Sequence, residues 1–112
     1  MTTFRAGDVI VGPLQAAQSN KTRPAVVLST QAYHATRPDI VVGIITTNTP
    51  AATAPSDHVI ADWQAAGLKR PSAFRTFIVT ADATTCRVIG HLSPRDWQAV
   101  QAAVRAAIDT GI

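Results

Sequence analysis

The stretch DIVVGIITT, Asp39–Thr47, decides the fold class of this chain. It is an almost unbroken run of β-branched and aliphatic residues, preceded by Pro38 and followed by the loop-forming TPAATAPS at Thr49–Ser56. A run of this length and composition is typical of a buried β-strand. We therefore expect the fold to be built around a central strand at Asp39–Thr47.

Shorter runs of the same kind lie on both sides of this strand. We expect them to form strands at Asp8–Leu14, Pro24–Ser29, Asp57–Ala61, Ser72–Ala81 and Thr84–His91. Pro24 is placed at the first position of its strand, where a missing N–H costs least. Gln15–Thr22 is expected to be a loop, and Gln31–Pro38 a connector or a short helical turn.

A helix is predicted at the C-terminal end of the chain. Ser93 supplies the cap, Pro94 the first helical position and Asp96 an acid in the first turn. One apolar face follows at helical spacing, made of Trp97, Val100, Val104, Ala107 and Ile108. Because the strands precede the helix and do not alternate with it, we expect a mainly β fold with some α. This is a small antiparallel barrel or sheet packed by the C-terminal helix.

The composition limits the classes of protein to be considered. A chain of 112 residues is expected to be one domain, residues 1–112, and 46% hydrophobic residues indicate a globular fold. No apolar run is long enough to span a bilayer, and the N-terminus lacks a secretory pattern. The single cysteine indicates a reduced, cytoplasmic protein without a structural metal. A net charge of +3 is compatible with a phosphate-rich partner.

The sequence gives little support for a metal site or for a catalytic nucleophile on the protein. His34, His58 and His91 have no metal-ligand spacing and no Cys or Glu cluster around them. A hydrolase that uses Cys86 with a histidine is conceivable, but Cys86 is expected to be a buried residue within a strand. No metal and no cofactor are therefore predicted.

Polar residues at strand ends are the candidates for a functional site. Arg23, Thr46, Thr47, Asn48 and Arg75 fall at such positions, and arginine with threonine suits phosphate binding better than nucleophilic attack. This set fits a reaction whose nucleophile belongs to the substrate, as the 2′-OH of RNA does. It is equally compatible with a protein that only binds phosphates.

Five motifs occur in one order along most of the chain. They are GDV at Gly7–Val9, RPAVVL at Arg23–Leu28, ITT at Ile45–Thr47, the stretch from Gly67 to Arg75, and IGHLS at Ile89–Ser93. In this order the sequence resembles the MazF/PemK family of toxin endoribonucleases. The resemblance implies an SH3-like barrel, a homodimer, and a cognate antitoxin that occupies the RNA groove. It also implies metal-independent cleavage of single-stranded RNA in the cytoplasm, as an mRNA interferase that leaves a cyclic phosphate and a 5′-OH.

The resemblance also assigns roles to individual residues. Arg23 and Thr46 take the catalytic positions, with Arg23 stabilising transition-state charge and Thr46 donating to the scissile phosphate. The RNA-binding residues are expected to be Thr47, Asn48, Arg75, Lys21, Lys69 and Arg70. Some relatives pair the arginine at Arg75 with an aspartate two residues later, where this chain has Phe77. The general base is open between His58, Asp57 and His34.

Two other functions remain open at this point. The first is a poison of DNA gyrase related to CcdB, a type that ends in Trp-Gly-Ile, whereas this chain ends in Thr110-Gly111-Ile112. The second is a non-catalytic relative that binds RNA or an antitoxin, for which Phe77 is the main argument. If the protein is a nuclease, loops are expected to read the RNA bases, and Gln15–Thr22 and Thr49–Ser56 are the predicted readers.

Overall fold

A curled antiparallel sheet and a C-terminal helix make up the computed structural model, which describes residues 3–16 and 19–109. The strands are β1 (Asp8–Ala16), β2 (Ser19–Val27), β3 (Asp39–Thr46), β4 (Asp57–Val59), β5 (Ala73–Asp82) and β6 (Arg87–His91). The helices are α1 (Gln31–Thr36) and α2 (Pro94–Ala107), and two short 3-10 turns are η1 (Thr49–Ala51) and η2 (Ala83–Thr85). Within the described ranges, no helix is both long and apolar enough to cross a membrane.

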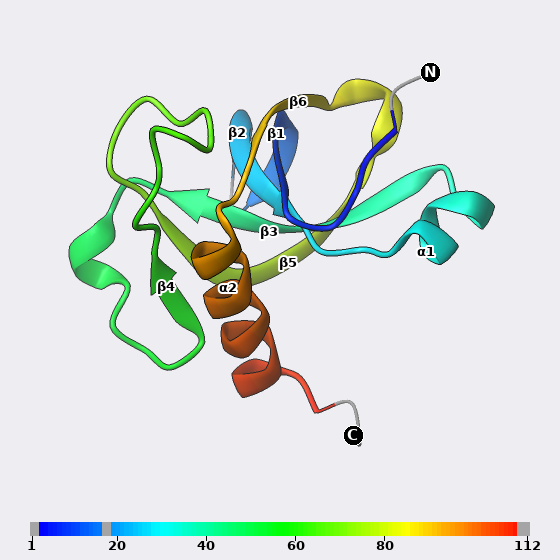
Figure 1. Ribbon diagram of the computed structural model, residues 1–112. Helices are drawn as coiled ribbons and strands as arrows, with labels where there is room; N and C mark the ends of the chain where they lie inside the picture. The colour runs from blue at the N-terminus through cyan, green and yellow to red at the C-terminus, as the bar shows by residue number, and fades with distance from the viewer. Residues whose placement is uncertain (1–2, 17–18, 110–112) are drawn as a thin grey trace.

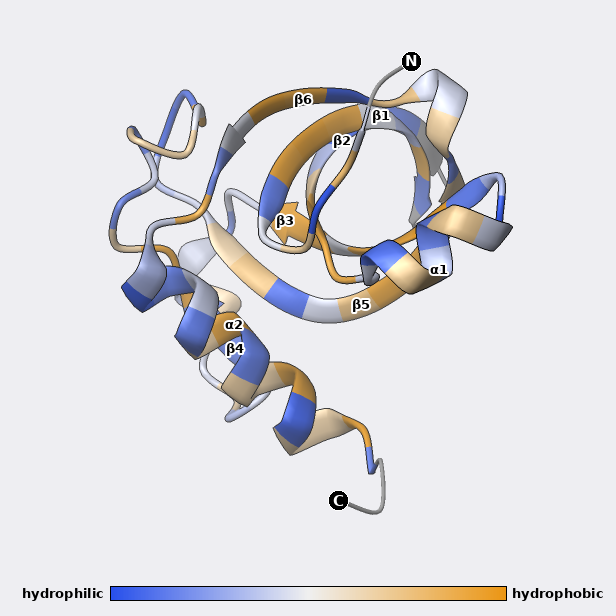
Figure 2. Ribbon diagram, turned by 45° about the vertical axis from the view of Figure 1, so that its right-hand side comes forward, coloured by the Kyte–Doolittle hydropathy of each residue, from blue (hydrophilic) through white to orange (hydrophobic). Residues whose placement is uncertain are grey.

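The six strands form one sheet in the order β4-β5-β3-β2-β1-β6, with every neighbouring pair antiparallel (Figure 1). The strand predicted to be central, β3, lies between β5 and β2. The sheet curls into a half-barrel, and α2 lies outside the curl (Figure 2). The predicted mainly β fold with a C-terminal helix is therefore confirmed, with the barrel present as an open, curled sheet.

Alternation of side chains along the strands divides the core into two clusters. The inner cluster fills the curl and includes Ile10, Leu14, Ala25, Val42, Ile44 and Cys86. The outer cluster lies beneath α2 and includes Val26, Ile45, Phe74, Leu92, Val100 and Ala103. Because β3 contributes adjacent residues to both clusters, its long apolar run reflects burial on two faces.

The strands β1 and β2 are longer than predicted and form a hairpin. β1 continues to Ala16 and β2 begins at Ser19, so the predicted loop Gln15–Thr22 is mostly strand. Pro24 therefore lies inside β2, opposite Val11 of β1, and not at a strand start. Small polar residues concealed this hairpin because they lack the β-branched pattern on which the prediction relied.

Smaller corrections concern the C-terminal half. Thr84 and Thr85 belong to η2, so Cys86 precedes β6 and does not lie within a strand, although it is buried as predicted. α2 has the predicted Ser93 cap and Pro94 start. Its apolar face is shorter than predicted, because Ile108 is 43% exposed beyond the end of the helix.

Candidate functional site

Of the two predicted catalytic residues, Thr46 is the last residue of β3, whereas Arg23 lies inside β2, just beyond the point where the pairing of β2 with β3 stops. The last pair in the β2–β3 register joins Ala25 to Ile44, and continuing that register by two residues sets Arg23 opposite Thr46. Thr46 in turn pairs with Ala73 of β5. Thr46 and Ala73 are thus a pair, and the extended register adds Arg23; we call these three residues the strand-end row.

Arg23 and Thr46 leave the same face of the sheet. Ile45 packs in the outer cluster, so the next residue, Thr46, faces the concave side. Ala25 packs in the inner cluster, and Arg23 lies two residues before it on the same face. The alternation thus places a guanidinium and a hydroxyl on the same face of the sheet.

Pro24 influences the position of Arg23 through the backbone. The β2–β3 pairing stops at Ala25, and the next residue toward the rim is a proline without an N–H to donate. Pro24 also restricts the backbone of Arg23 to extended conformations. Arg23 is half-buried and its Nε is shielded from solvent, so its surroundings constrain the side chain.

The hydroxyl of Thr46 takes part in the turn that follows β3. Its Oγ1 accepts a hydrogen bond of 3.1 Å from the backbone N–H of Asn48. A hydroxyl that accepts in this way keeps its own proton for donation. Thr47 and Asn48 are exposed beside it, so three polar residues border the rim at the end of β3.

Arg75 has a carboxylate partner, although the sequence has Phe77 where some relatives have the paired aspartate. Asp57 of β4 lies opposite Arg75 of β5, and the Arg75 Nε is 3.4 Å from an oxygen of Asp57. Asp57 also accepts a hydrogen bond of 3.1 Å from the N–H of Ala54. An aspartate from the neighbouring strand thus supplies an Arg–Asp pair although Phe77 occupies the later position on β5.

The remaining predicted RNA-binding residues are exposed cations. Lys21 lies on β2 opposite Leu14, two residues from Arg23 toward the hairpin tip. Lys69 and Arg70 precede β5 on the loop that leads to Ala73. Gly67 fixes that loop: its φ is +86°, and a Cβ there would lie 2.3 Å from the carbonyl oxygen of Ile89.

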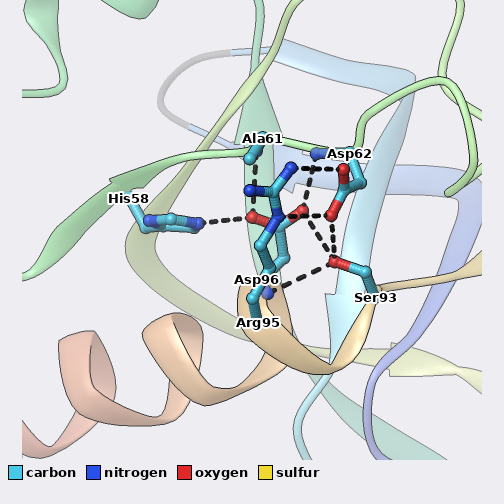
Figure 3. A network of polar contacts seen from close by, with 6 residues as sticks. All are labelled: His58, Ala61, Asp62, Ser93, Arg95 and Asp96. Carbon is cyan, nitrogen blue, oxygen red and sulfur yellow. Dashed lines mark hydrogen bonds and ion pairs between the residues drawn. The ribbon is translucent and has the colours of Figure 1, made fainter.

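His58, one candidate general base, belongs to a separate network at the start of α2 (Figure 3). Its Nε2 is 2.7 Å from Oδ1 of Asp96, which is fully buried. The Asp96 carboxylate also accepts the backbone N–H groups of Ala61 and Asp62, at 2.9 and 2.8 Å. The Ser93 hydroxyl donates to Asp62 at 2.5 Å and lies 3.2 Å from an oxygen of Asp96, and Arg95 binds Asp62 with two nitrogens. We call these residues the α2 anchor.

The electrostatics of the α2 anchor favour ionised carboxylates. Burial raises the pKa of Asp96, but hydrogen bonds from His58, Ala61 and Asp62 outweigh burial and lower it overall. The hydrogen bonds from Arg95 and Ser93 hold the pKa of Asp62 well below its usual range. The anchor joins β4 to α2 with its polar groups mutually satisfied, which is the pattern of a structural cluster.

The other histidines and the cysteine are also engaged inside the protein. His34 bonds Ser29 at 2.6 Å and the carbonyl of Phe4, and His91 bonds the buried Asp8 at 2.8 Å. Burial raises the pKa of the Cys86 thiol, which disfavours the reactive thiolate. Among the described residues, no three His, Cys, Asp or Glu side chains are grouped so that they could hold a metal ion.

Sequence reasoning missed two features of this part of the molecule. The first is the pairing of Asp57 with Arg75, which needs the β4–β5 register and is invisible in linear spacing. The second is the role of Asp96, which reads as an ordinary first-turn acid but is fully buried. An aspartate three residues after a Ser cap is typical of a helix start, and this pattern does not reveal the partners on β4 and in the segment after it.

Solved structures from two groups of bacteria share this fold. An endoribonuclease in complex with its cognate antitoxin from a mycobacterial species is 17% identical, with a TM-score of 0.74 over 94% of both chains. The Mycobacterium tuberculosis toxin MazF-mt6 is 20% identical, with a TM-score of 0.72 over 89% of this chain and 94% of that one. MazF of a MazE-MazF structure from Deinococcus radiodurans is 14% identical, with a TM-score of 0.70 over 95% of both.

A family model gives the more specific comparison. No curated protein sequence matches the chain. The model of the PemK-like, MazF-like toxins of type II toxin–antitoxin systems matches residues 5–108. This match includes every β-strand, both helices and the whole strand-end row. The chain therefore belongs to the family of PemK-like, MazF-like toxins of type II toxin–antitoxin systems.

Proposed function

We propose that this toxin is a metal-independent endoribonuclease that cleaves single-stranded RNA, mRNA above all, in the cytoplasm. The observation that carries the proposal is the β2–β3 register, which pairs Ala25 with Ile44 and, when continued by two residues, aligns Arg23 with Thr46 on one face of the sheet. A positive guanidinium and a hydroxyl donor at this position suit a phosphate. The rim beside them is exposed and carries further polar residues, as an RNA path requires.

The chemistry follows from the substrate's own nucleophile. The 2′-OH of RNA attacks the adjacent phosphorus, the bond to the 5′ oxygen breaks, and the products are a 2′,3′-cyclic phosphate and a 5′-OH. Negative charge builds on the phosphate oxygens in the transition state, where Arg23 stabilises it and Thr46 donates a hydrogen bond. Arg23 acts through its charge, because the pKa of an arginine is too high for it to give up a proton readily.

Binding of the RNA is assigned to the residues around the row. Thr47, Asn48 and Arg75 lie on or next to the strands that form it. Lys21, Lys69 and Arg70 are exposed on adjoining segments and contribute long-range attraction to phosphates.

The protein partners are proposed by analogy with the family. A mycobacterial structure with this fold is an endoribonuclease in complex with its cognate antitoxin. We expect an antitoxin segment to occupy the same rim in this toxin and so to exclude RNA. We also expect a homodimer. The alternative of a gyrase poison depended on Thr110-Gly111-Ile112, which lie outside the described residues.

The experiment is a product analysis with pure, antitoxin-free protein in EDTA. Synthetic single-stranded RNAs of varied sequence are incubated with wild type and with Arg23→Ala, and the ends are identified by mass spectrometry. The proposal expects a cyclic phosphate and a 5′-OH from wild type and intact RNA from the variant. Intact RNA with both proteins, combined with loss of gyrase supercoiling in a parallel assay, would favour the gyrase alternative.

A further inference from the structure

A pocket lies next to the strand-end row, where β5 departs from regular pairing with β3. Gly43 pairs with Ile78 and Ile45 with Phe74, so the single residue Ile44 faces three residues of β5. Such a bulge redirects side chains and is common beside functional sites. It contributes to a pocket of about 380 Å³ lined by Ala54, Ser56, Asp57, Arg75, Thr76 and Phe77.

The polar part of this pocket is organised around Asp57. Its side chain is only 4% exposed, and it accepts hydrogen bonds from Ala54 N–H and Arg75 Nε. Arg75 uses Nε for this contact, and its two terminal nitrogens carry four more N–H donors. Because the Arg75 side chain is 47% exposed, the buried carboxylate orients a guanidinium that solvent and ligands can reach.

Two further residues complete the pocket. Thr76 donates a hydrogen bond of 2.6 Å to the carbonyl of Ser56, which ties the bulge to the segment before β4. Phe77 is 43% exposed, although it is a large aromatic residue. An exposed aromatic ring beside an oriented arginine is the combination with which proteins stack and read unpaired RNA bases.

We propose that this pocket is a base-reading subsite for guanine, with Phe77 as the stacking residue and Arg75 as the residue that selects the base. The proposal rests on the proposed function, because it places the base of an RNA substrate in the pocket. Guanine presents two acceptors, O6 and N7, side by side on one edge, and the paired donors of an arginine match them. Adenine offers one acceptor and one donor on that edge, so the same fork selects against it.

The position of the pocket fits a nucleotide next to the cleavage point. Arg75 is two residues beyond Ala73, the β5 member of the strand-end row, and about 7 Å from it along the strand. A base held by Arg75 and Phe77 would therefore belong to a nucleotide close to the phosphate held by Arg23 and Thr46. This arrangement also explains Phe77: with Asp57 supplying the carboxylate from β4, the later β5 position is left for stacking.

The test measures binding apart from cleavage. The probes are oligouridine octamers with one central G, A or C, made with 2′-deoxyribose so that cleavage is blocked, and a fourth octamer carries 7-deazaguanine in place of G. Affinities are measured by fluorescence anisotropy at one fixed salt concentration. For wild type we expect the G octamer to bind about tenfold tighter than the A octamer, and 7-deazaguanine to lose most of that gain.

Two variants separate the roles of the two residues. Arg75→Lys is expected to remove the preference for G, because a lysine offers a point charge and not a fork. Phe77→Ala is expected to weaken all octamers by about fivefold or more, while Phe77→Trp retains binding. Unchanged melting temperatures and an unchanged oligomeric mass serve as controls.

Several outcomes would overturn the subsite. They are equal affinity for all octamers, no effect of 7-deazaguanine, or a Phe77→Ala variant that binds RNA normally but changes its oligomeric mass. The last result would make Phe77 part of a subunit interface. Cleavage of RNA without any preference for G would overturn only the subsite. A preference for G in a protein that cleaves no RNA would overturn only the proposed nuclease activity.

Discussion

The α2 anchor and the polar residues beside the strand-end row differ in access to solvent. In the anchor, Asp96 is fully buried, and both of its oxygens accept hydrogen bonds from neighbouring residues. Beside the row, Thr47 and Asn48 are exposed, and the Arg75 side chain is 47% exposed. A polar cluster that satisfies itself fixes the fold, whereas one that faces solvent can bind a ligand. The following predictions test this division from the largest expected effect to the smallest.

Removal of the guanidinium from the row should affect the reaction most. Arg23→Ala is expected to lower the rate of RNA cleavage by about 100-fold or more, because the transition-state charge loses its main stabiliser. Arg23→Lys should restore part of the rate, since a lysine returns the positive charge but not the paired N–H donors of the guanidinium. Single-turnover cleavage of a labelled RNA measures the effect, and a melting curve checks the fold. Near-normal cleavage by Arg23→Ala would remove this residue from the site.

The opposite behaviour is expected of the anchor. Asp96→Asn should lower the free energy of unfolding by about 3 kcal/mol, because an amide cannot accept all the hydrogen bonds that the buried carboxylate accepts. Urea unfolding measures this loss, and Gln98→Ala on the exposed face of α2 is the matched control. Cleavage per folded molecule should stay at the wild-type level. A stable Asp96→Asn protein with lost activity would mean that the two regions are not separate in function.

Acid should lower the free energy of unfolding more steeply in wild type than in the Asp96→Asn variant, which lacks the anchor carboxylate. Since the pKa of Asp96 and that of Asp62 are lowered in the folded state, their contributions are fully present above the ordinary aspartate pKa near 3.8. They are lost as the pH falls below that value. Unfolding followed from pH 6 to pH 2 should therefore show a steeper acid loss for wild type than for Asp96→Asn. Equal slopes would contradict the assignment.

Thr46 should have an intermediate effect at the row. Thr46→Val removes the hydroxyl that donates to the phosphate and is expected to slow cleavage about tenfold, the value of roughly one hydrogen bond. Thr46→Ser keeps that hydroxyl and should remain close to wild type. Because the Oγ1 also accepts from Asn48, a melting curve must show that the turn after β3 persists. Equal rates for the Val and Ser variants would argue against hydroxyl donation.

The exposed lysines should have the smallest effect, visible mainly through salt. Lys21→Ala and Lys69→Ala are each expected to reduce the slope of log affinity against log salt by about 0.7, the value for one contact to a single-strand phosphate. Arg105→Ala, exposed on α2, is the control and should leave the slope unchanged. If the Arg105 variant changes the slope as much as the lysine variants, RNA does not follow the rim.

The sequence predicted some parts of this molecule well for physical reasons. β3 and the start of α2 were found because a doubly buried strand and a capped helix each have strong local patterns. The β1–β2 hairpin was missed because the residues around its tip are mostly small and polar and lack the β-branched pattern of a strand. The resemblance singled out Arg23, Thr46 and Arg75, and Asp57 was a candidate general base, but only the β4–β5 register revealed Asp57 as the partner of Arg75.

The central claim is that Arg23 and Thr46 act on one phosphate, and a double-mutant cycle tests it most directly. Single-turnover kcat/KM values are measured for wild type, Arg23→Ala, Thr46→Ala and the double variant on one RNA. If both side chains contact the same phosphate, the cycle should give a coupling energy of about 1 kcal/mol or more. Additivity within about 0.3 kcal/mol would show that the two residues act independently and would contradict this account of the site.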